Sequence, residues 1–137
     1  MSLLPRKGKR INVAGFYTKT GKFIYQTQVN SFNHQDLILF FDHFCTSIDK
    51  RTIVVLDNAP THRGKAFQAK RKEWQQQDLY LYFLPPYSPE LNAIELLWRQ
   101  IKYQWLYLKA FLNFDSLSFY LHQVLDNINT KYSIIFD

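Results

Sequence analysis

The first part of the chain alternates apolar and polar residues in two short runs. Residues 10–17 predict a strand, residues 18–22 a turn, and residues 23–29 the returning strand of a hairpin. The period then becomes helical over residues 36–48, and either Ser31 or Asn33 is suited to cap the helix start. The pattern therefore predicts a hairpin followed by an amphipathic helix.

Two short apolar runs, separated by a polar helix, occupy the middle of the chain. Residues 53–56 are wholly apolar, as expected for a strand buried on both faces, and residues 79–84 are again apolar and strand-like. Residues 64–77 between them predict a basic helix whose few core positions are Phe67 and Trp74. Proline at 85 and 86 ends the second strand, since proline cannot donate to a ladder.

Two further helices are predicted toward the C-terminal end. Apolar residues mark one face from Asn92, a good N-cap, to about Leu108, and again over residues 117–128. The order is strand, strand, helix, strand, helix, strand, helix, helix. An antiparallel hairpin followed by alternating helices and strands predicts an α/β fold, with a mixed sheet and helices on both faces. With no internal repeat or linker, we expect one domain over residues 1–137.

Composition adds a partner class to this picture. The chain has 137 residues, 47% of them hydrophobic, and a formal net charge of +6, which favours a polyanion as partner. Its single cysteine, Cys45, fits a reducing compartment and lies at an apolar helix position, which favours a buried structural role. No apolar run reaches about 18 residues and the N-terminus lacks a signal-peptide core. We expect a cytoplasmic protein that handles nucleic acid and has no membrane partner.

Two carboxylates stand where apolar structure gives way to a turn or a helix start. Asp57 directly follows the apolar run 53–56, and Glu95 lies in the first turns of the helix that begins near Asn92. Residues 58–94 leave room for one helix and one strand, the path that brings two carboxylates together at one sheet edge. Paired carboxylates at a sheet edge are typical of Mg²⁺ sites for phosphoryl transfer.

Each carboxylate also has a simpler interpretation. Asp57 can merely start a turn, as many aspartates at strand ends do. Glu95 stands four residues before Arg99 and seven before Lys102, and a Glu–Arg pair at that spacing is an ordinary surface pair worth about 0.3–0.5 kcal/mol. Taken singly, neither residue establishes a metal site.

Longer motifs around the two carboxylates carry a family resemblance. The motifs are Val55-Leu56-Asp57-Asn58-Ala59-Pro60-Thr61-His62 and Leu84-Pro85-Pro86-Tyr87-Ser88-Pro89-Glu90-Leu91-Asn92-Ala93-Ile94-Glu95-Leu96-Leu97-Trp98. Together they resemble the catalytic domain of DDE transposases of the Tc/mariner superfamily, and most closely its bacterial insertion-sequence branch. The resemblance covers the chain from about Lys9 onward. Ala93 departs from the proline common there, which a helix start tolerates.

The resemblance implies a ribonuclease H-like fold and a metal-dependent chemistry. In that family three acidic residues bind two divalent metals, and by motif match Asp57 corresponds to the second acid and Glu95 to the third. The implied cofactor is Mg²⁺, with Mn²⁺ as a plausible substitute because hard oxygen ligands suit both ions. The implied reaction is two-metal phosphoryl transfer, in which DNA strands are cut and joined without a covalent protein intermediate.

The first acid of the family has no counterpart in this sequence. In the family's layout it lies on the first strand, upstream of a glycine- and basic-rich segment like residues 5–10, and nothing before Pro5 is acidic. Three later aspartates do not suit an edge-of-sheet ligand: Asp36, Asp42 and Asp49. We therefore expect the chain to lack the first-Asp strand and the upstream helix-turn-helix region. It would then be a decayed remnant or the downstream part of a split frame, with a catalytic two-ion site that is incomplete alone.

Several other residues are candidates near this site. Asn58 and His62 either support the metal site or stabilise the turn. The basic residues that closely follow Asp57 are Arg63, Lys65, Lys70, Arg71 and Lys72, and they either track DNA phosphates or form a solvated helix face. Arg99 and Lys102 lie one and two turns beyond Glu95. We expect DNA contacts from Arg63, Lys65, Arg99 and Lys102.

Three functions compete at this stage. The first is a transposase catalytic-domain fragment whose partners are terminal inverted repeats, target DNA and an upstream transposase segment. The second is a non-catalytic DNA-binding or oligomerising remnant of the same fold, and the third is a metal-dependent nuclease. The sequence leaves the oligomeric state open, a homodimer included.

Overall fold

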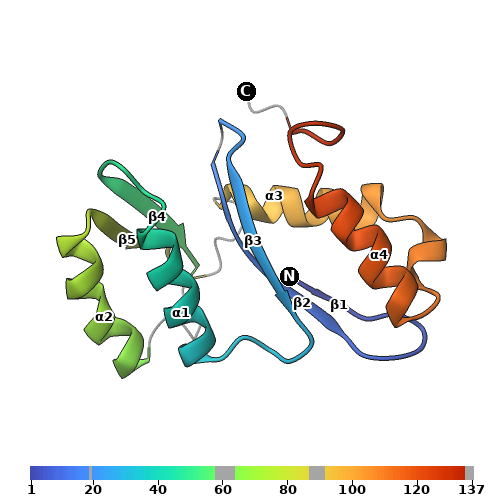
Figure 1. Cartoon of the computed structure of the whole chain (residues 1–137), viewed down its shortest axis with the longest axis horizontal. Coiled ribbons are helices and arrows are strands. Elements are labelled where there is room, and N and C mark those ends of the chain that lie inside the picture. The colour runs from blue at the N-terminus through green and yellow to red at the C-terminus, as the bar shows by residue number, and fades with distance from the viewer. Residues whose placement is uncertain (19, 58–63, 87–91, 135–137) are drawn as a thin grey trace. The chain divides into compact units, whose positions relative to one another are not determined.

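A computed structural model describes residues 1–18, 20–57, 64–86 and 92–134 (Figure 1). The chain divides into two compact units. Unit 1 comprises Met1–Ser31 together with Ala93–Asp137, and unit 2 comprises Phe32–Asn92. Each unit has its own sheet and its own helices, and the expectation of a single domain stays a prediction.

Unit 1 is built on a three-stranded antiparallel sheet in the order β1-β2-β3. The strands are β1 (Ser2–Leu3), β2 (Ile11–Tyr17) and β3 (Phe23–Gln28). The predicted hairpin is confirmed, with Gly15 of β2 opposite Tyr25 of β3. The short β1 was not expected from the sequence. It pairs with the start of β2, where Leu3 lies opposite Ile11.

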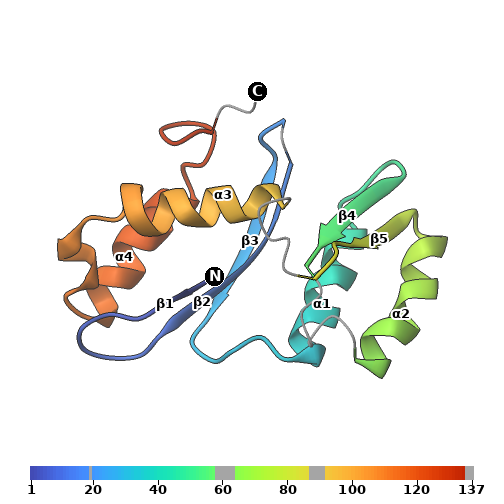
Figure 2. The same cartoon turned by 180° about the vertical axis from the view of Figure 1, so that it is seen from behind.

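The C-terminal helices complete unit 1. They are α3 (Ala93–Gln100), the π-helical turn η3 (Ile101–Trp105), the 3₁₀ turn η4 (Leu108–Phe111) and α4 (Phe114–Leu125). Figure 2 shows α3 crossing the strands of the sheet, and α3 contacts β2. The fully buried core side chains of this unit come from both layers: Leu3, Ile11, Val13, Leu97, Ile101, Leu117 and Leu121.

Trp98 of α3 packs against β2 at a position that glycine occupies, Gly15. A Cβ on Gly15 would lie 3.0 Å from Trp98 Cη2 and 3.0 Å from a ring carbon of Phe23. The Phe23 and Trp98 rings meet edge to face with centroids 6.1 Å apart. Gly15 is therefore the residue that lets the indole pack directly against the strand. Trp98 is 9% exposed and belongs to the core of unit 1.

The long helix expected from residue 92 to about 108 is wrong in its second half. Regular α-helix ends at Gln100, the π-helical turn follows, and Leu106 adopts an extended conformation with φ −95° and ψ 119°. Ile101 and Leu106 are both buried, so the chain changes its winding and still keeps both apolar side chains in the core. A straight helix cannot be distinguished from this path by the spacing of apolar residues alone.

Unit 2 has the element order of a βαβ unit preceded by a helix. Its elements are α1 (His34–Cys45), β4 (Thr52–Leu56), α2 (Lys65–Gln76) and β5 (Leu79–Phe83). Strands β4 and β5 are parallel, with Thr52 opposite Leu79 and Leu56 opposite Phe83. The antiparallel and parallel pairs, with helices packed on them, confirm the expected α/β class. None of the helices in the described ranges is long and apolar enough to cross a membrane.

Helix α1 begins at one of the two expected caps. The side chain of Asn33 accepts a hydrogen bond from the Asp36 N–H, and the Asp36 side chain accepts one from the Asn33 N–H. This reciprocal pair satisfies two backbone donors that the helix itself leaves unpaired. The choice of Asn33 over Ser31 is thereby settled.

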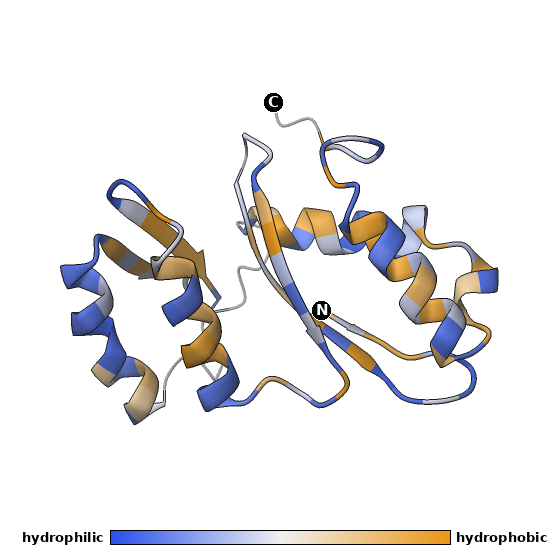
Figure 3. Ribbon diagram, in the orientation of Figure 1, coloured by the Kyte–Doolittle hydropathy of each residue, from blue (hydrophilic) through white to orange (hydrophobic). Residues whose placement is uncertain are grey.

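An aromatic cluster holds the helices of unit 2 together. Phe41 of α1 stacks on Trp74 of α2 with centroids 5.0 Å apart, and Phe67 meets both rings edge to face. Phe67 and Trp74 are fully buried, which confirms them as the core positions of a helix that is otherwise hydrophilic over most of its length (Figure 3). The thiol of Cys45 is also buried, as expected.

The expectation that residues 53–56 are buried on both faces is wrong. Ile53 is 67% exposed and Val55 is 41% exposed, whereas Leu56 is buried. Alternate side chains of a strand point to opposite faces, so Ile53 and Val55 share one face of β4, and that face is exposed. An apolar run with no polar alternation does not by itself show that both faces are covered.

Candidate metal site and DNA-binding residues

Asp57 lies at the carboxyl end of the parallel strands of unit 2. It directly follows β4. The Leu84 N–H donates to the Leu56 carbonyl at 2.8 Å, so the hydrogen bonds between the two strands continue up to the residue before Asp57. Asp57 is half-buried. Ligands of open α/β sheets gather beyond the carboxyl ends of strands, and Asp57 occupies such a position on a rigid support.

Glu95 lies in the first turn of α3 in unit 1. It is half-buried, and its neighbours Leu97 and Trp98 belong to the buried core of unit 1. A carboxylate in a first turn is favoured by the helix dipole, and its anchoring next to two core residues fixes the backbone that carries it. The structure thus confirms that Glu95 lies in the first turn of a helix, and its role as a metal ligand stays a prediction.

Asp57 and Glu95 belong to different units, so a joint site stays a prediction. Across the described ranges, no group of three or more histidine, cysteine, aspartate or glutamate side chains is placed to hold a metal ion. The donor set itself fits a hard divalent cation, because both groups are carboxylates and Mg²⁺ takes oxygen ligands.

Two of the three aspartates that the sequence analysis judged unsuited to metal binding have structural partners. Asp36 belongs to the cap of α1. Asp42 accepts a hydrogen bond from the Trp74 indole N–H at 2.8 Å and pairs with the Lys70 ammonium at 3.2 Å. Asp49 is exposed after α1. The expectation that Asp36 and Asp42 do other work than metal binding agrees with these contacts.

The basic helix α2 divides its charges between structure and solvent. Lys70 pairs with Asp42 and with Glu73, whose carboxylate lies 2.6 Å away, and these hydrogen bonds raise the pKa of Lys70. Arg71 turns back to the sheet, where it donates to the Leu81 carbonyl at 3.2 Å and lies over the Phe83 ring. The charges of both residues are engaged within the protein, which sets them apart from the other basic residues of α2. Lys65 and Lys72 remain exposed.

On α3 and η3, Arg99 and Lys102 are both exposed. Lys102 Nζ lies 5.5 Å from the centre of the neighbouring Tyr103 ring, an arrangement that leaves its ammonium accessible. Both residues lie C-terminal to Glu95 on the same stretch, as the sequence predicted. Asn58, His62 and Arg63 lie outside the described residues, and so does the segment 87–91 of the second motif.

Burial raises the pKa of the Cys45 thiol, and the Asp42 carboxylate raises it further against an opposing effect of Lys70. A buried thiol with a raised pKa holds little thiolate at neutral pH, and thiolate is the reactive form. The structure therefore supports a packing role for Cys45.

The sequence model of the family described as "DDE superfamily endonuclease" matches residues 3–118, which is most of the chain. No sequence among the curated proteins matches the chain significantly. The family match includes both Asp57 and Glu95.

Three solved structures share the fold. The Mos1 transposase paired-end complex with left transposon end aligns with a TM-score of 0.66 at 16% identity, over 92% of this chain and 39% of that one. The Mos1 strand transfer complex aligns with a TM-score of 0.61 at 15% identity, over 92% and 38%. The simian T-cell lymphotropic virus intasome, in complex with a PP2A regulatory subunit, aligns with a TM-score of 0.60 at 16% identity, over 90% and 45%. The chain thus spans less than half the length of these proteins, and the likeness confirms the expected ribonuclease H-like fold.

Proposed function

The chain belongs to the DDE superfamily of endonucleases, and on that premise we propose that it is a catalytic-domain part of a DNA transposase. The observation that carries the proposal is the family match over residues 3–118, together with two carboxylates at the ends of defined elements. Two of the solved structures with this fold are complexes of Mos1 transposase, one with a transposon end and one described as a strand transfer complex. These complexes support transposon-end and target DNA as the partners here.

Asp57 and Glu95 supply carboxylate ligands to a divalent metal site in this proposal. Asp57 is held by the end of β4 and Glu95 by the first turn of α3, so each oxygen donor sits on a regular element. Mg²⁺ is the ion that two carboxylates and a phosphate suit best, and Mn²⁺ substitutes for it. When bound, such ions activate the attacking oxygen and stabilise the leaving oxygen of a phosphodiester.

The exposed cations give the DNA backbone its counter-charges. Lys65 begins α2, eight residues after Asp57, whereas Arg99 and Lys102 follow Glu95 on its own helix and the turn after it. Each predicted metal ligand is therefore accompanied by exposed positive charge nearby in the sequence. Phosphate contacts of this kind position a duplex without reading its sequence.

A further acidic ligand is required for two-ion chemistry. Asp36 and Asp42 are engaged in the cap of α1 and with Trp74, which makes them poor donors for that role. In this proposal the missing ligand comes from an additional transposase segment, and the chain by itself binds metal without cutting DNA efficiently. Nicking of supercoiled plasmid in Mg²⁺ or Mn²⁺ tests this part. Rapid nicking that Asp57→Asn abolishes would show that the chain needs no further ligand.

Metal binding is tested by titrating Mn²⁺ into the folded chain by calorimetry. We expect Asp57→Asn and Glu95→Gln each to weaken binding by at least about tenfold. Two matched controls remove a charge elsewhere. Asp49→Asn changes an exposed aspartate of unit 2, and Asp115→Asn changes a first-turn acid of α4. Equal affinities for all five proteins would exclude both carboxylates as ligands.

A further inference from the structure

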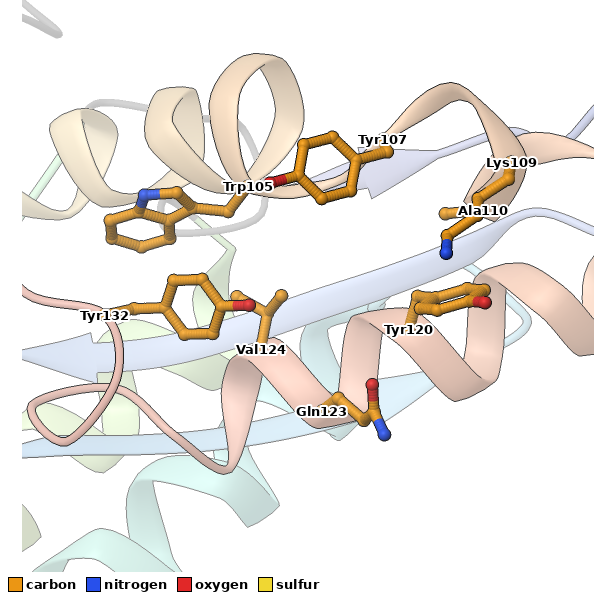
Figure 4. Close-up of a pocket in the computed structure, with 8 residues that line it drawn as sticks. All are labelled: Trp105, Tyr107, Lys109, Ala110, Tyr120, Gln123, Val124 and Tyr132. Atoms are coloured by element: carbon orange, nitrogen blue, oxygen red, sulfur yellow. The ribbon is translucent and has the colours of Figure 1, made fainter.

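A small cavity lies among the C-terminal helical elements of unit 1. It lies between the turns η3 and η4 on one side and α4 with the following segment on the other, and has a volume of about 150 Å³. Figure 4 shows its lining, in which Ala110 and Val124 supply the aliphatic surface. Both of these are buried, so the floor of the cavity belongs to the core of the unit.

Four of the eight residues that line the cavity are aromatic. Trp105 and Tyr132 face each other with ring centroids 5.0 Å apart and planes tilted by 44°. Tyr107 is 71% exposed at the same cavity, and Tyr120 lines it from α4. An exposed tyrosine at a cavity whose floor is apolar offers a stacking surface that folding itself does not use. Rings of this kind stack on flat aromatic ligands.

One cation and one amide accompany the rings. Lys109 Nζ lies 5.1 Å from the centre of the Tyr120 ring, and Figure 4 shows its side chain directed toward that ring. Gln123, one turn along α4, is exposed at the cavity. An ammonium suits a phosphate, and a carboxamide carries both donors and an acceptor for the polar edge of a base. The ligand that matches all three features is an anion that carries a flat, polar ring.

The volume limits the size of that ring. A cavity of about 150 Å³ in a protein core is known to hold benzene, a single six-membered ring. The cavity in unit 1 has about the same volume, so one six-membered ring fits. A pyrimidine base satisfies this limit, whereas the second ring of a purine extends beyond it.

We propose that this cavity binds the base of an unpaired pyrimidine nucleotide in DNA, with Tyr107 stacking on the base and Lys109 pairing with its phosphate. The inference rests on the proposed function only in taking DNA as the partner. The net charge of +6 favours a polyanion over an aromatic side chain of a protein partner. Stacking on aromatic side chains is also how proteins hold bases that lie outside a duplex.

The test compares fluorescently labelled single-stranded oligo(dT), oligo(dA) and a mixed-sequence duplex of equal length, by anisotropy in EDTA. We expect oligo(dT) to bind more tightly than oligo(dA). Tyr107→Ala is expected to weaken oligo(dT) binding by roughly fivefold or more and to leave duplex binding within about twofold. Tyr103→Ala is the matched control, since Tyr103 is 67% exposed in the same stretch and does not line the cavity. Equal losses from Tyr107→Ala on both DNA forms, or from the two tyrosine variants, would overturn the proposal.

Photocrosslinking tests the same contact in the unaltered chain. Oligo(dT) carrying 5-iodouracil is irradiated with the protein, and the linked peptides are identified by mass spectrometry. We expect crosslinks at Trp105, Tyr107, Tyr120 or Tyr132, and crosslinks confined to other residues would contradict the proposal. Both measurements omit metal, so their outcome does not depend on whether Asp57 and Glu95 are metal ligands. Conversely, metal binding can be confirmed while the crosslinks lie elsewhere.

Discussion

Trp74 of α2 donates its indole N–H to the carboxylate of Asp42 in α1, at 2.8 Å. Trp74 has no exposed surface, so this bond satisfies a donor that water cannot reach. The Lys70 ammonium pairs with the same carboxylate at 3.2 Å. Asp42 therefore links the two helices of unit 2, a structural role that engages its carboxylate.

Replacing Asp42 should destabilise unit 2. Asp42→Ala leaves the buried indole N–H unpaired and removes one of the two partners of Lys70, and we expect the free energy of unfolding to fall by about 1–3 kcal/mol. Urea denaturation followed by tryptophan fluorescence measures this. Asp49→Ala, an exposed aspartate in the same unit, serves as control and should cost no more than about 0.5 kcal/mol.

A double-mutant cycle isolates the hydrogen bond itself. Trp74→Phe removes the donor and keeps an aromatic ring in the cluster. In that background Asp42→Ala should cost clearly less than it does in the unaltered chain. The same cost in both backgrounds would mean that Asp42 stabilises the helices by some other contact.

Gly15 should resist any larger side chain. Its added Cβ would already meet Trp98 and Phe23 at 3.0 Å, so Gly15→Val forces two rings to move. We expect a loss of about 1–3 kcal/mol in the free energy of unfolding, despite the preference of valine for strands. Thermal denaturation measures it, with Gln26→Ala on the exposed side of the neighbouring strand β3 as control. Unchanged stability in Gly15→Val would show that α3 is not tightly packed on this strand.

Tyr25 should make stability depend on alkaline pH. Burial, together with the hydrogen bond that its hydroxyl donates to Asp126 and the charge of that carboxylate, raises the pKa of Tyr25 from 10.0 to about 12. Because the folded state holds this proton more tightly, the stabilisation is complete below pH 10 and is lost as pH rises toward 12. The unfolding free energy of the unaltered chain should therefore approach that of Tyr25→Phe across this window. A difference that stays constant from pH 9 to 12 would contradict the assignment.

Exposed basic residues and a lysine that is paired with carboxylates should differ in their effect on DNA affinity. Lys65→Gln, Arg99→Gln and Lys102→Gln are each expected to weaken duplex binding and to lower the slope of log affinity against log salt by about 1. Lys70→Gln removes the same charge from α2, but Lys70 pairs with Asp42 and Glu73. It should lower stability and leave the slope nearly unchanged. Equal slopes for all four variants would contradict the division of charges on α2.

Local rules were sufficient to predict most elements. The hairpin, the helix capped by Asn33, the parallel strands and the last helix each have a distinct period, cap or turn. Apart from β1 and the turns η3 and η4, the order of elements therefore agrees with the sequence expectation. The α/β class follows from that order. Asp57 directly follows a strand and Glu95 lies in the first turn of a helix, as their motifs indicated.

Contacts between distant residues could not be predicted in this way. The return of Arg71 to the Leu81 carbonyl and the bond from Tyr25 to Asp126 join residues that no sequence period links. The winding change at Ile101 keeps the apolar spacing of a helix, and the exposed face of β4 keeps the composition of a buried strand. Each of these depends on how elements pack, which apolar and polar patterns do not specify.

We propose that one divalent ion is bound by both Asp57 and Glu95. Mn²⁺ broadens the NMR signals of nearby amides, so a substoichiometric titration of the isotopically labelled chain reports which segments surround the ion. We predict that the amides of Asp57 and Glu95 broaden together at the same low Mn²⁺ concentration, and that Asp57→Asn abolishes the broadening at Glu95. Broadening at only one of them, or broadening at Glu95 that persists in Asp57→Asn, would contradict a shared site.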